Sequence, residues 1–296
     1  MNSYKLGIDL GGSKIEGAIL SERNEVLFRE RVATEQEKGY AHILNRIKAL
    51  YDKMVGEIGG ASHTFGIGTP GAVSPKTGLL RNSNTLCLND RPLAQELEKL
   101  LGRPVVMQND ANCFALAEAV LGAGVGHHLV FGIIMGTGCG GGIVCGGEVR
   151  TGPHAIAGEW GHTSIDPDGE QCWCGSRGCL ETIISGGGLE QLYRKQFGRP
   201  RKLADIVADY RAGRERETGF MQTFFANFGR GVANLINVLD PDIIVLGGGL
   251  SNIDELYTEG VSEVAKRVFS DYLTTPIVKN RLGDSAGVLG AAMVGR

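Results

Sequence analysis

Apolar residues in the first half of the chain fall into short β-type runs and longer helical repeats. Strands are predicted at residues 4–9, 14–20, 26–32, 64–68 and 104–108. Helices are predicted at 39–58, 92–101 and 110–121. The first helix is predicted from apolar residues that recur at helical spacing, namely Ile43, Ile47, Leu50 and Met54.

The second half repeats this order of elements. Strands are predicted at 128–135, 142–145, 148–150, 242–246 and 277–280, with helices in much of 185–238, at 253–270 and at 286–294. Each half begins with three strands, has a glycine turn after the first, and then alternates helix and strand. This duplication predicts an α/β protein whose two domains face one another across a ligand-binding cleft.

The predicted domains follow from this repeat. We expect a first domain at 1–120 and a second at 121–284, with a loop inserted at 158–181. The C-terminal helix, 285–296, is expected to pack on the first domain. A chain of 296 residues is long enough to give each domain its own core.

Charge and composition narrow the classes of partner. The 30 basic and 33 acidic residues give a net charge of −3 without a long block of one sign, so nucleic acid is not an expected partner. We find neither an apolar run of membrane-spanning length nor a secretory segment, and we therefore expect a cytoplasmic protein without a membrane partner. The 46 glycines cluster at strand ends, where backbone can approach a ligand closely.

The loop 158–181 carries a histidine and three of the seven cysteines. The residues His162, Cys172, Cys174 and Cys179 are four ligands of the kind that bind tetrahedral zinc, and a closed set of four predicts a structural site. The alternatives are chance proximity or one disulfide with an unpaired thiol; an odd cysteine total and the tight Cys-x-Cys spacing weaken both. Such a metal would hold Glu159 and Glu181 toward a polyhydroxylated ligand.

Glycine turns in both halves are candidate phosphate sites. In Asp9-Leu-Gly-Gly-Ser-Lys14 the glycine amides could bind phosphate and Asp9 could hold Mg²⁺ through water, although an ordinary hairpin turn would look similar. The segment 136–141 matches G-x-G-x-x-G, but a strand rather than a helix follows it, which argues against a dinucleotide fingerprint. Gly248 and Gly249 follow a buried strand and leave room either for adenine and ribose or for a packing turn.

Asp110 lies where a strand meets a helix, within Gln108-Asn-Asp-Ala-Asn112. Spacing alone favours a helix N-cap. The positive end of the helix would also keep this carboxylate ionised, as suits a base that orients a sugar hydroxyl during phosphoryl transfer. Both interpretations are open at this level.

Motifs that span nearly the whole chain resemble those of the ROK family of sugar kinases and repressors. They are Asp9-x-Gly-Gly-Ser-Lys14, Thr69-Pro-Gly71, Asn109-Asp-Ala-Asn112, Gly136-Thr-Gly-x-Gly-Gly-Gly142, Gly158-Glu-Trp-Gly-His162 and Cys172-x-Cys-Gly-x-x-Gly-Cys-x-Glu181. The resemblance implies the actin-like (hexokinase-type) ATPase fold. Ser13 stands where the family usually has threonine, and the hydroxyl is retained.

The resemblance also implies roles for individual residues. Asp110 would be the general base that activates the 6-hydroxyl of a hexose. Sugar contacts would come from Gly71, Asn84, Asn109, Glu159, His162 and Glu181. ATP contacts would come from Gly7, Ile8, Asp9, Leu10, Gly11, Gly12, Ser13, Lys14, Gly136, Thr137, Gly138, Cys139, Gly140, Gly141, Gly142 and Ile143. The family further implies ATP with Mg²⁺, zinc on the four ligands named above, and a homodimer.

Within the family, Glu159-Trp-Gly-His162 and the segment 73–78 look most like bacterial fructokinases that also accept mannose. N-acetylglucosamine kinases and glucokinases are the alternatives. A sugar-responsive repressor is disfavoured because we find no helix-turn-helix module before the strand expected at Tyr4. An inactive sugar-binding protein is disfavoured because Asp110 and both glycine turns are intact.

Overall fold

The computed structural model describes residues 4–295 and divides into two compact units. The first comprises the chain up to Leu121, residues 147–157, and the chain from Leu282 onward; the second comprises 122–146 and 158–281. The two large sheets have five strands each, which confirms the predicted α/β class. That 1–120 and 121–284 are separate domains around a cleft stays a prediction.

The sheet of the first unit brings polar residues together at the carboxyl ends of its parallel strands. Its order is β3-β2-β1-β4-β7, formed by β1 (Tyr4–Leu10), β2 (Lys14–Leu20), β3 (Val26–Ala33), β4 (His63–Thr69) and β7 (Val106–Asn109). Strands β1, β4 and β7 are parallel, with Asp9 opposite Gly68 and Thr69 opposite Asn109. Their carboxyl ends therefore lie at the same end of the sheet, and Asp9 and Asn109 lie there.

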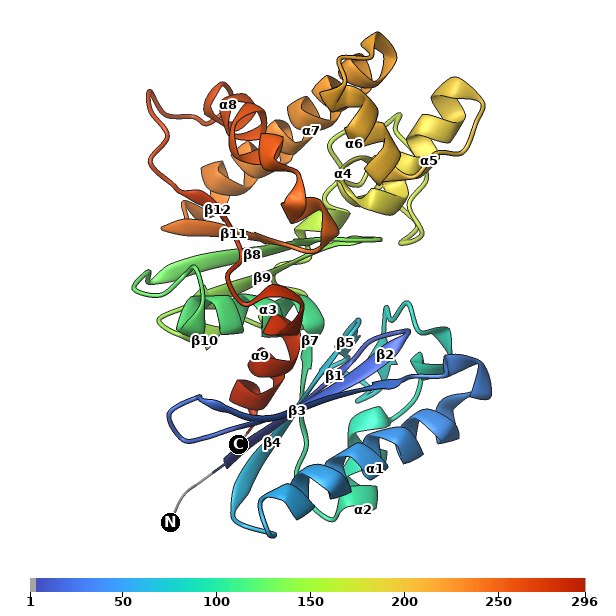
Figure 1. Ribbon diagram of the computed structural model, residues 1–296, viewed down its shortest axis with the longest axis vertical. Coiled ribbons are helices and arrows are strands. Elements are labelled where there is room, and N and C mark those ends of the chain that lie inside the picture. The colour runs from blue at the N-terminus through green and yellow to red at the C-terminus, as the bar shows by residue number, and fades with distance from the viewer. Residues whose placement is uncertain (1–3, 296) are drawn as a thin grey trace. The chain divides into compact units, whose positions relative to one another are not determined.

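Helices cover both faces of this sheet (Figure 1). The face with α1 (Tyr40–Glu57) and α2 (Leu93–Leu101) contains the apolar core, and the predicted stripe of α1 is buried there. On the other face, α9 (Ala286–Val294) packs on β1, β4 and α3 (Asp110–Leu121). The helix lies so close that a Cβ on Gly7 would be 2.3 Å from the Ala292 nitrogen.

Short elements connect these strands and helices. They are η1 (Gln36–Lys38), the small hairpin β5 (Ala72–Val73) and β6 (Leu80–Arg81), η2 (Leu86–Leu88) and η6 (Gly283–Ser285). The hairpin was not predicted, because its strands are only two residues long.

The second sheet has the order β10-β9-β8-β11-β12. Its strands are β8 (Leu129–Met135), β9 (Cys139–Cys145), β10 (Glu148–Val149), β11 (Ile243–Gly247) and β12 (Ile277–Lys279). The prediction that a strand begins at 142 was wrong, because β9 begins at Cys139. Its glycines permit close packing: a Cβ on Gly141 would lie 2.7 Å from Trp160 Cδ1.

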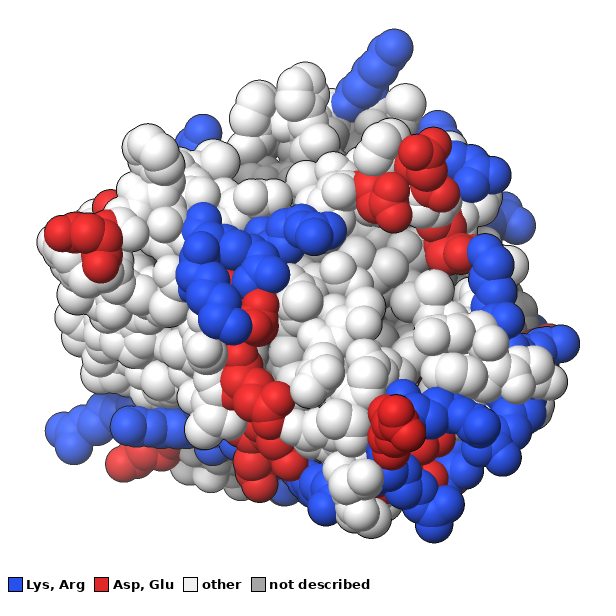
Figure 2. Space-filling view, turned by 90° about the horizontal axis from the view of Figure 1, so that it is seen from above, with Lys and Arg blue, Asp and Glu red and all other residues white. Residues whose placement is uncertain are grey.

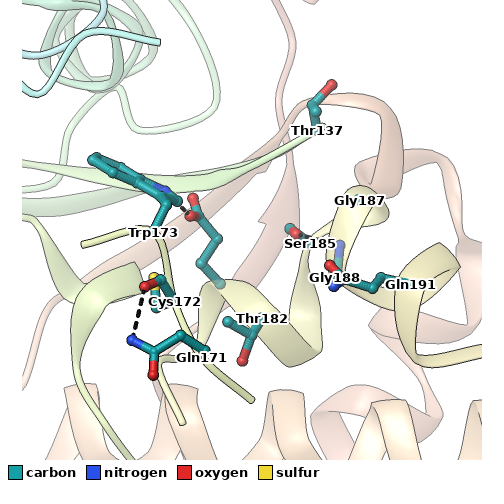
Figure 3. A pocket seen from close by; sticks show the side chains of 10 residues that line it. Thr137, Gln171, Cys172, Trp173, Thr182, Ser185, Gly187, Gly188 and Gln191 are labelled. Atoms are coloured by element: carbon teal, nitrogen blue, oxygen red, sulfur yellow. Dashed lines mark hydrogen bonds between the residues drawn. The ribbon is translucent and has the colours of Figure 1, made fainter. Parts of the chain in front are cut away.

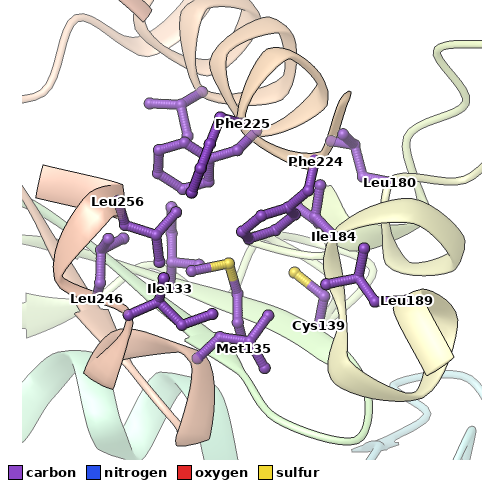
Figure 4. Close-up of a cluster of buried hydrophobic side chains, with 14 of the residues drawn as sticks. Ile133, Met135, Cys139, Leu180, Ile184, Leu189, Phe224, Phe225, Leu246 and Leu256 are labelled. Carbon is purple, nitrogen blue, oxygen red and sulfur yellow. The ribbon is translucent and has the colours of Figure 1, made fainter. Parts of the chain in front are cut away.

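Helices of the second unit lie together on one face of its sheet (Figure 1). They are η3 (Trp160–His162), α4 (Glu181–Ile184), α5 (Gly186–Phe197), α6 (Leu203–Arg211), α7 (Glu215–Leu239), η4 (Gly249–Asn252), η5 (Asp254–Tyr257) and α8 (Glu259–Ala265). In the core, Phe224 and Phe225 of α7 lie over Ile133 and Met135 of β8 (Figure 4).

The predicted helix at 253–270 was wrong in extent. Only Glu259–Ala265 is α-helical, preceded by the short η5. Side chains bind the flanking backbone instead: the Tyr257 hydroxyl donates to the Ser251 carbonyl, and Asn237 Oδ1 accepts the Phe269 N–H. The Phe269 N–H, which would bind the Ala265 carbonyl in a continuing helix, is thus used by Asn237.

The surface charge and the character of the helices agree with what the composition predicts. The face in Figure 2 carries small groups of basic and acidic residues interspersed between uncharged areas. Within residues 4–295, none of the helices combines the length and the apolar character that crossing a bilayer requires.

Candidate functional site

Asn109 is the last residue of β7 and directly precedes the start of α3. Its Oδ1 accepts the N–H groups of Ala111 (2.9 Å) and Asn112 (3.4 Å), while its Nδ2 donates to the Gly71 carbonyl (3.1 Å). Asn109 is therefore the capping side chain, and the interpretation of Asp110 as the N-cap was wrong. Asp110 is the first helical residue, and its Oδ1 also accepts the Ala111 N–H at 2.9 Å.

Asp9 lies in an acidic environment at the same end of the sheet. Burial raises its pKa from 3.8 to about 7, and the negative charges of Asp110 and Glu16 add to this rise, whereas Lys14 and Arg31 oppose it. A cation would relieve the repulsion between Asp9 and Asp110. Carboxylate oxygens suit Mg²⁺, so the residues present fit a hard divalent cation bound directly or through water.

The turn between β1 and β2 is held from β3. The Gly11 N–H donates to the Lys14 carbonyl (2.9 Å), and buried Thr34 donates its hydroxyl to the Gly11 carbonyl (2.7 Å) and its N–H to the Ser13 carbonyl (3.0 Å). Sequence reasoning missed Thr34, because only the pairing of β2 with β3 brings it to the turn. Gly7, Ile8 and Leu10 lie inside β1 rather than in the turn.

Gly71 requires glycine on two grounds. Its φ is +79°, and a Cβ there would lie 2.1 Å from the Arg81 carbonyl oxygen. The hydrogen bond from Asn109 ties this turn to α3. Asn84 is exposed on the segment that follows β6, where its Oδ1 accepts the Thr85 hydroxyl at 3.5 Å. The first unit thus brings together Asp9, Gly71, Asn109 and Asp110. Asn84 lies on the segment that follows β6.

The four predicted metal ligands of the second unit converge; we call His162, Cys172, Cys174 and Cys179 the Cys/His cluster. His162 Nδ1 is 3.6 Å from Cys172 Sγ, Cys174 Sγ is 3.6 Å from Cys179 Sγ, and all four ligand atoms lie within 4.8 Å of one another. Zn–S bonds of about 2.3 Å in a tetrahedron place sulfurs about 3.8 Å apart, so the cluster fits zinc.

Thiol chemistry and loop geometry agree with this fit. All seven cysteines are free thiols, so the disulfide alternative is not observed in residues 4–295. Burial alone would raise the pKa of Cys174, but hydrogen bonds from the Ser176 amide and the neighbouring thiols lower it to about 7. Gly178 has φ +66°, and a Cβ there would lie 1.7 Å from the Asp166 carbonyl oxygen, so this turn can only be made by glycine.

Two carboxylates flank the cluster. Burial raises the pKa of Glu159, with His162 opposing the rise and Glu181 adding to it. Glu181 Oε2 accepts the Cys139 N–H (2.8 Å), and Oε1 accepts the Trp173 indole N–H (2.6 Å). A carboxylate has about four lone-pair sites, so Glu181 can also accept from a ligand hydroxyl.

A pocket of ≈ 430 Å³ lies in the second unit beside Glu181. Trp173 and Thr137 lie far apart in it, and Ser185 and Gln191 line it from the side of α5 (Figure 3). Trp173 is 64% exposed. The pocket therefore connects the Cys/His cluster with the turn between β8 and β9.

We call residues 136–139 the glycine hairpin. The Gly136 N–H donates to the Gly138 carbonyl at 2.9 Å. The Cys139 side chain is in the core, where burial raises the pKa of its thiol, so only its backbone faces Glu181. The remaining predicted ATP contacts of this segment, Gly140, Gly141, Gly142 and Ile143, lie within β9.

The third glycine cluster serves packing at one residue and leaves space at the next. Gly248 has φ +78°, and a Cβ there would lie 2.4 Å from the Met135 carbonyl oxygen. For Gly249, no described atom lies within 4 Å of a Cβ position. A role in binding adenine stays a prediction, with Gly249 as the better placed of the two.

Comparison with known proteins gives a consistent result. A family model described as "ROK family" matches residues 5–296. An N-acetyl-D-glucosamine kinase of Pasteurella multocida (strain Pm70) is 39% identical over 299 residues, covering 97% of this chain and 98% of that protein.

Two solved structures are similar over almost their full lengths. The ROK hexokinase from Thermus thermophilus has a TM-score of 0.90 and 34% identity, covering 99% of this chain and 97% of that one. A ROK family glucokinase from Streptomyces griseus, in complex with glucose and AMPPNP, has a TM-score of 0.80 and 28% identity, covering 99% of each chain. These similarities confirm the predicted actin-like, hexokinase-type ATPase fold.

Proposed function

We propose, from the premise that this chain belongs to the ROK family, that it is an ATP-dependent sugar kinase that phosphorylates the 6-hydroxyl of a hexose. The observation that carries the proposal is the 39% identity with an N-acetyl-D-glucosamine kinase over 97% of the chain. The junction of β7 and α3 supports it further, because Asn109 caps the helix and Asp110 is its first residue, at the positive end of the helix.

N-acetylglucosamine is the sugar we now favour. The motifs predict fructose, with mannose as a further substrate, and N-acetylglucosamine or glucose as the alternatives. The curated relatives favour the first alternative: a second one, from Vibrio cholerae, is also an N-acetyl-D-glucosamine kinase and is 38% identical over 298 residues, covering 97% of this chain and 98% of that protein. The expectation of fructose finds no such support.

Asp110 would act as the general base. Its carboxylate would accept a hydrogen bond from the sugar 6-hydroxyl and take the proton as the sugar oxygen bonds to the γ-phosphorus, while the bond from the γ-phosphorus to the β,γ-bridging oxygen breaks and ADP leaves. A loose transition state requires mainly that the hydroxyl be oriented, and the proton moves late. The Gly71 and Asn109 contacts fix the start of α3 and hence the position of Asp110. Asn84, Glu159, His162 and Glu181 would contact the other hydroxyls.

The two glycine turns would bind the phosphates of ATP through backbone N–H groups. In the first unit this is the turn 11–14, held by Thr34; in the second it is the glycine hairpin. When bound beside Asp9, Mg²⁺ would supply positive charge to the phosphates during transfer. The Cys/His cluster would hold zinc, whose closed ligand set gives it a structural role.

A substrate survey tests the proposal. Purified protein would be assayed with MgATP and equal concentrations of N-acetylglucosamine, glucose, mannose and fructose. We expect the highest kcat/KM with N-acetylglucosamine. A highest value with fructose would restore the first interpretation, and no transfer to any hexose would overturn the proposed function. The same preparation, sized by light scattering, tests the family-based expectation of a homodimer.

A further inference from the structure

One short segment holds the glycine hairpin from two sides. Glu181 Oε2 accepts the Cys139 N–H at 2.8 Å. At the start of α5, the Gly186 N–H donates to the Gly136 carbonyl (2.8 Å) and the Gly187 N–H to the Thr137 carbonyl (3.2 Å). The backbone of the hairpin is thus bound by residues that follow the Cys/His cluster directly in the chain.

The close approach of these segments depends on glycine. A Cβ on Gly138 would lie 2.6 Å from Glu181 Oε2, and a Cβ on Gly187 would lie 2.7 Å from the Thr137 carbonyl oxygen. Real Cβ atoms do not approach oxygen so closely, so a side chain at either position would push the segments apart. Gly138 therefore leaves room for the Glu181 carboxylate, and Gly187 leaves room for the backbone of the hairpin.

Glu181 is tied equally closely to the Cys/His cluster. Trp173 lies between two ligands of the cluster and donates its indole N–H to Glu181 Oε1 at 2.6 Å. Its ring meets the His162 ring edge-on, with centroids 5.0 Å apart and an interplanar angle of 88°. On the other side, the Thr182 hydroxyl donates to the carbonyl of Cys179 at 2.7 Å.

We propose that Glu181 is a positioning residue that couples the Cys/His cluster to the glycine hairpin, so that metal in the cluster keeps the hairpin ordered for a phosphate ligand. The carboxylate has one donor from each side, and each donor restricts the other. If the cluster opens, Trp173 and Glu181 are no longer held, and the Cys139 amide loses a charged acceptor. The phosphate ligand, but not the coupling, rests on the proposed function.

The first test uses the metal-loaded protein. Trp173→Phe removes the indole N–H but keeps an aromatic ring, and Gln191→Ala is the matched control in the same pocket. Hydrogen exchange at the Cys139 amide and binding of AMPPNP without sugar are measured, with zinc content determined for each protein. We expect exchange about tenfold faster and a nucleotide Kd raised a few-fold in Trp173→Phe alone, as for loss of one charged hydrogen bond. Unchanged exchange at full zinc content would overturn the proposal.

The second test asks whether metal acts through Glu181. Zinc is removed by chelation and then restored in wild type and in Glu181→Ala. We expect removal to speed Cys139 exchange and weaken AMPPNP binding in wild type, restoration to reverse both, and Glu181→Ala to show the fast exchange with or without metal. An equal response to zinc in both proteins would overturn the coupling.

The exchange and binding measurements distinguish failure of the coupling from unfolding and from failure of the proposed function. Should chelation unfold the second unit, the comparison of Trp173→Phe with Gln191→Ala in loaded protein decides the proposal. Should wild type bind no AMPPNP, the proposed function fails, while the exchange rate at Cys139 still decides whether Glu181 couples the cluster to the hairpin.

Discussion

The two units position their acidic residues by different means. In the first unit, Asp9 and Asp110 lie at the end of a strand and the start of a helix, so backbone hydrogen bonds of regular elements fix them. In the second unit, Glu159 precedes η3 and Glu181 begins the four-residue α4, at either end of a largely irregular loop in which the side chains of the Cys/His cluster converge. Regular elements provide order through their own hydrogen bonds, whereas an irregular loop needs a cross-link to lose its conformational freedom.

The largest expected effect tests the chemistry of the first unit. Asp110→Asn keeps the shape of the side chain but removes the base, so we expect kcat to fall by about 10²–10⁴-fold with sugar binding retained. Asp52→Asn, on the exposed face of α1, is the control and should leave kcat unchanged. Steady-state kinetics and calorimetric sugar binding measure this, and undiminished kcat in Asp110→Asn would refute the assignment of the base.

The next effect tests the proposed metal cross-link of the second unit. Cys179→Ser removes a buried ligand of the cluster, and we expect loss of bound zinc together with several kcal/mol of stability, since metal binding and folding of the loop are coupled. Exposed Cys145→Ser is the matched control, expected to change stability by no more than about 0.5 kcal/mol. Metal analysis and thermal unfolding report both. Equal unfolding temperatures for the two variants would show that the cluster has no structural role.

A third effect tests whether the stability of the first unit depends on backbone geometry at a turn. Gly71→Ala meets both a positive φ and the Arg81 carbonyl, and we expect a cost of about 2 kcal/mol or more. In Gly102→Ala the φ of +65° is similar, but no described atom lies within 4 Å of the new Cβ, so about 1 kcal/mol is expected. Chemical denaturation measures the difference. Similar costs would mean that the turn at Gly71 moves freely.

The last effect is a dependence on pH, which is small over any one pH unit. The raised pKa of Asp9, about 7 against an ordinary 3.8, means that the folded protein holds this proton where the unfolded chain has released it. The free energy of unfolding should therefore fall as pH rises from about 4 to 7, by no more than about 1.4 kcal/mol per pH unit for this group. Asp9→Asn should remove this contribution. Denaturation without added magnesium measures it, and identical slopes in wild type and variant would contradict it.

Parts of the fold that depend on local pattern were predictable. The helix at 40–57 was found from its apolar stripe, and the buried strand 243–247 from its continuous apolar run, because each pattern reflects its own burial. The helix at 253–270 was overestimated, because the Phe269 N–H donates to the distant Asn237 side chain instead of continuing the helix, and sequence spacing does not reveal that contact.

The sequence by itself determined which residues are candidates for binding and chemistry. Cysteine and histidine spacing identified the Cys/His cluster, because four ligands lie close along one loop, and the strand-to-helix junction identified Asp110 as a candidate. Only the tertiary structure decided that Asn109 caps α3, that Thr34 holds the turn at Gly11, and that Trp173 and the Cys139 amide share Glu181. These contacts join residues that are distant in the chain or use backbone atoms, and neither leaves a pattern of side-chain types.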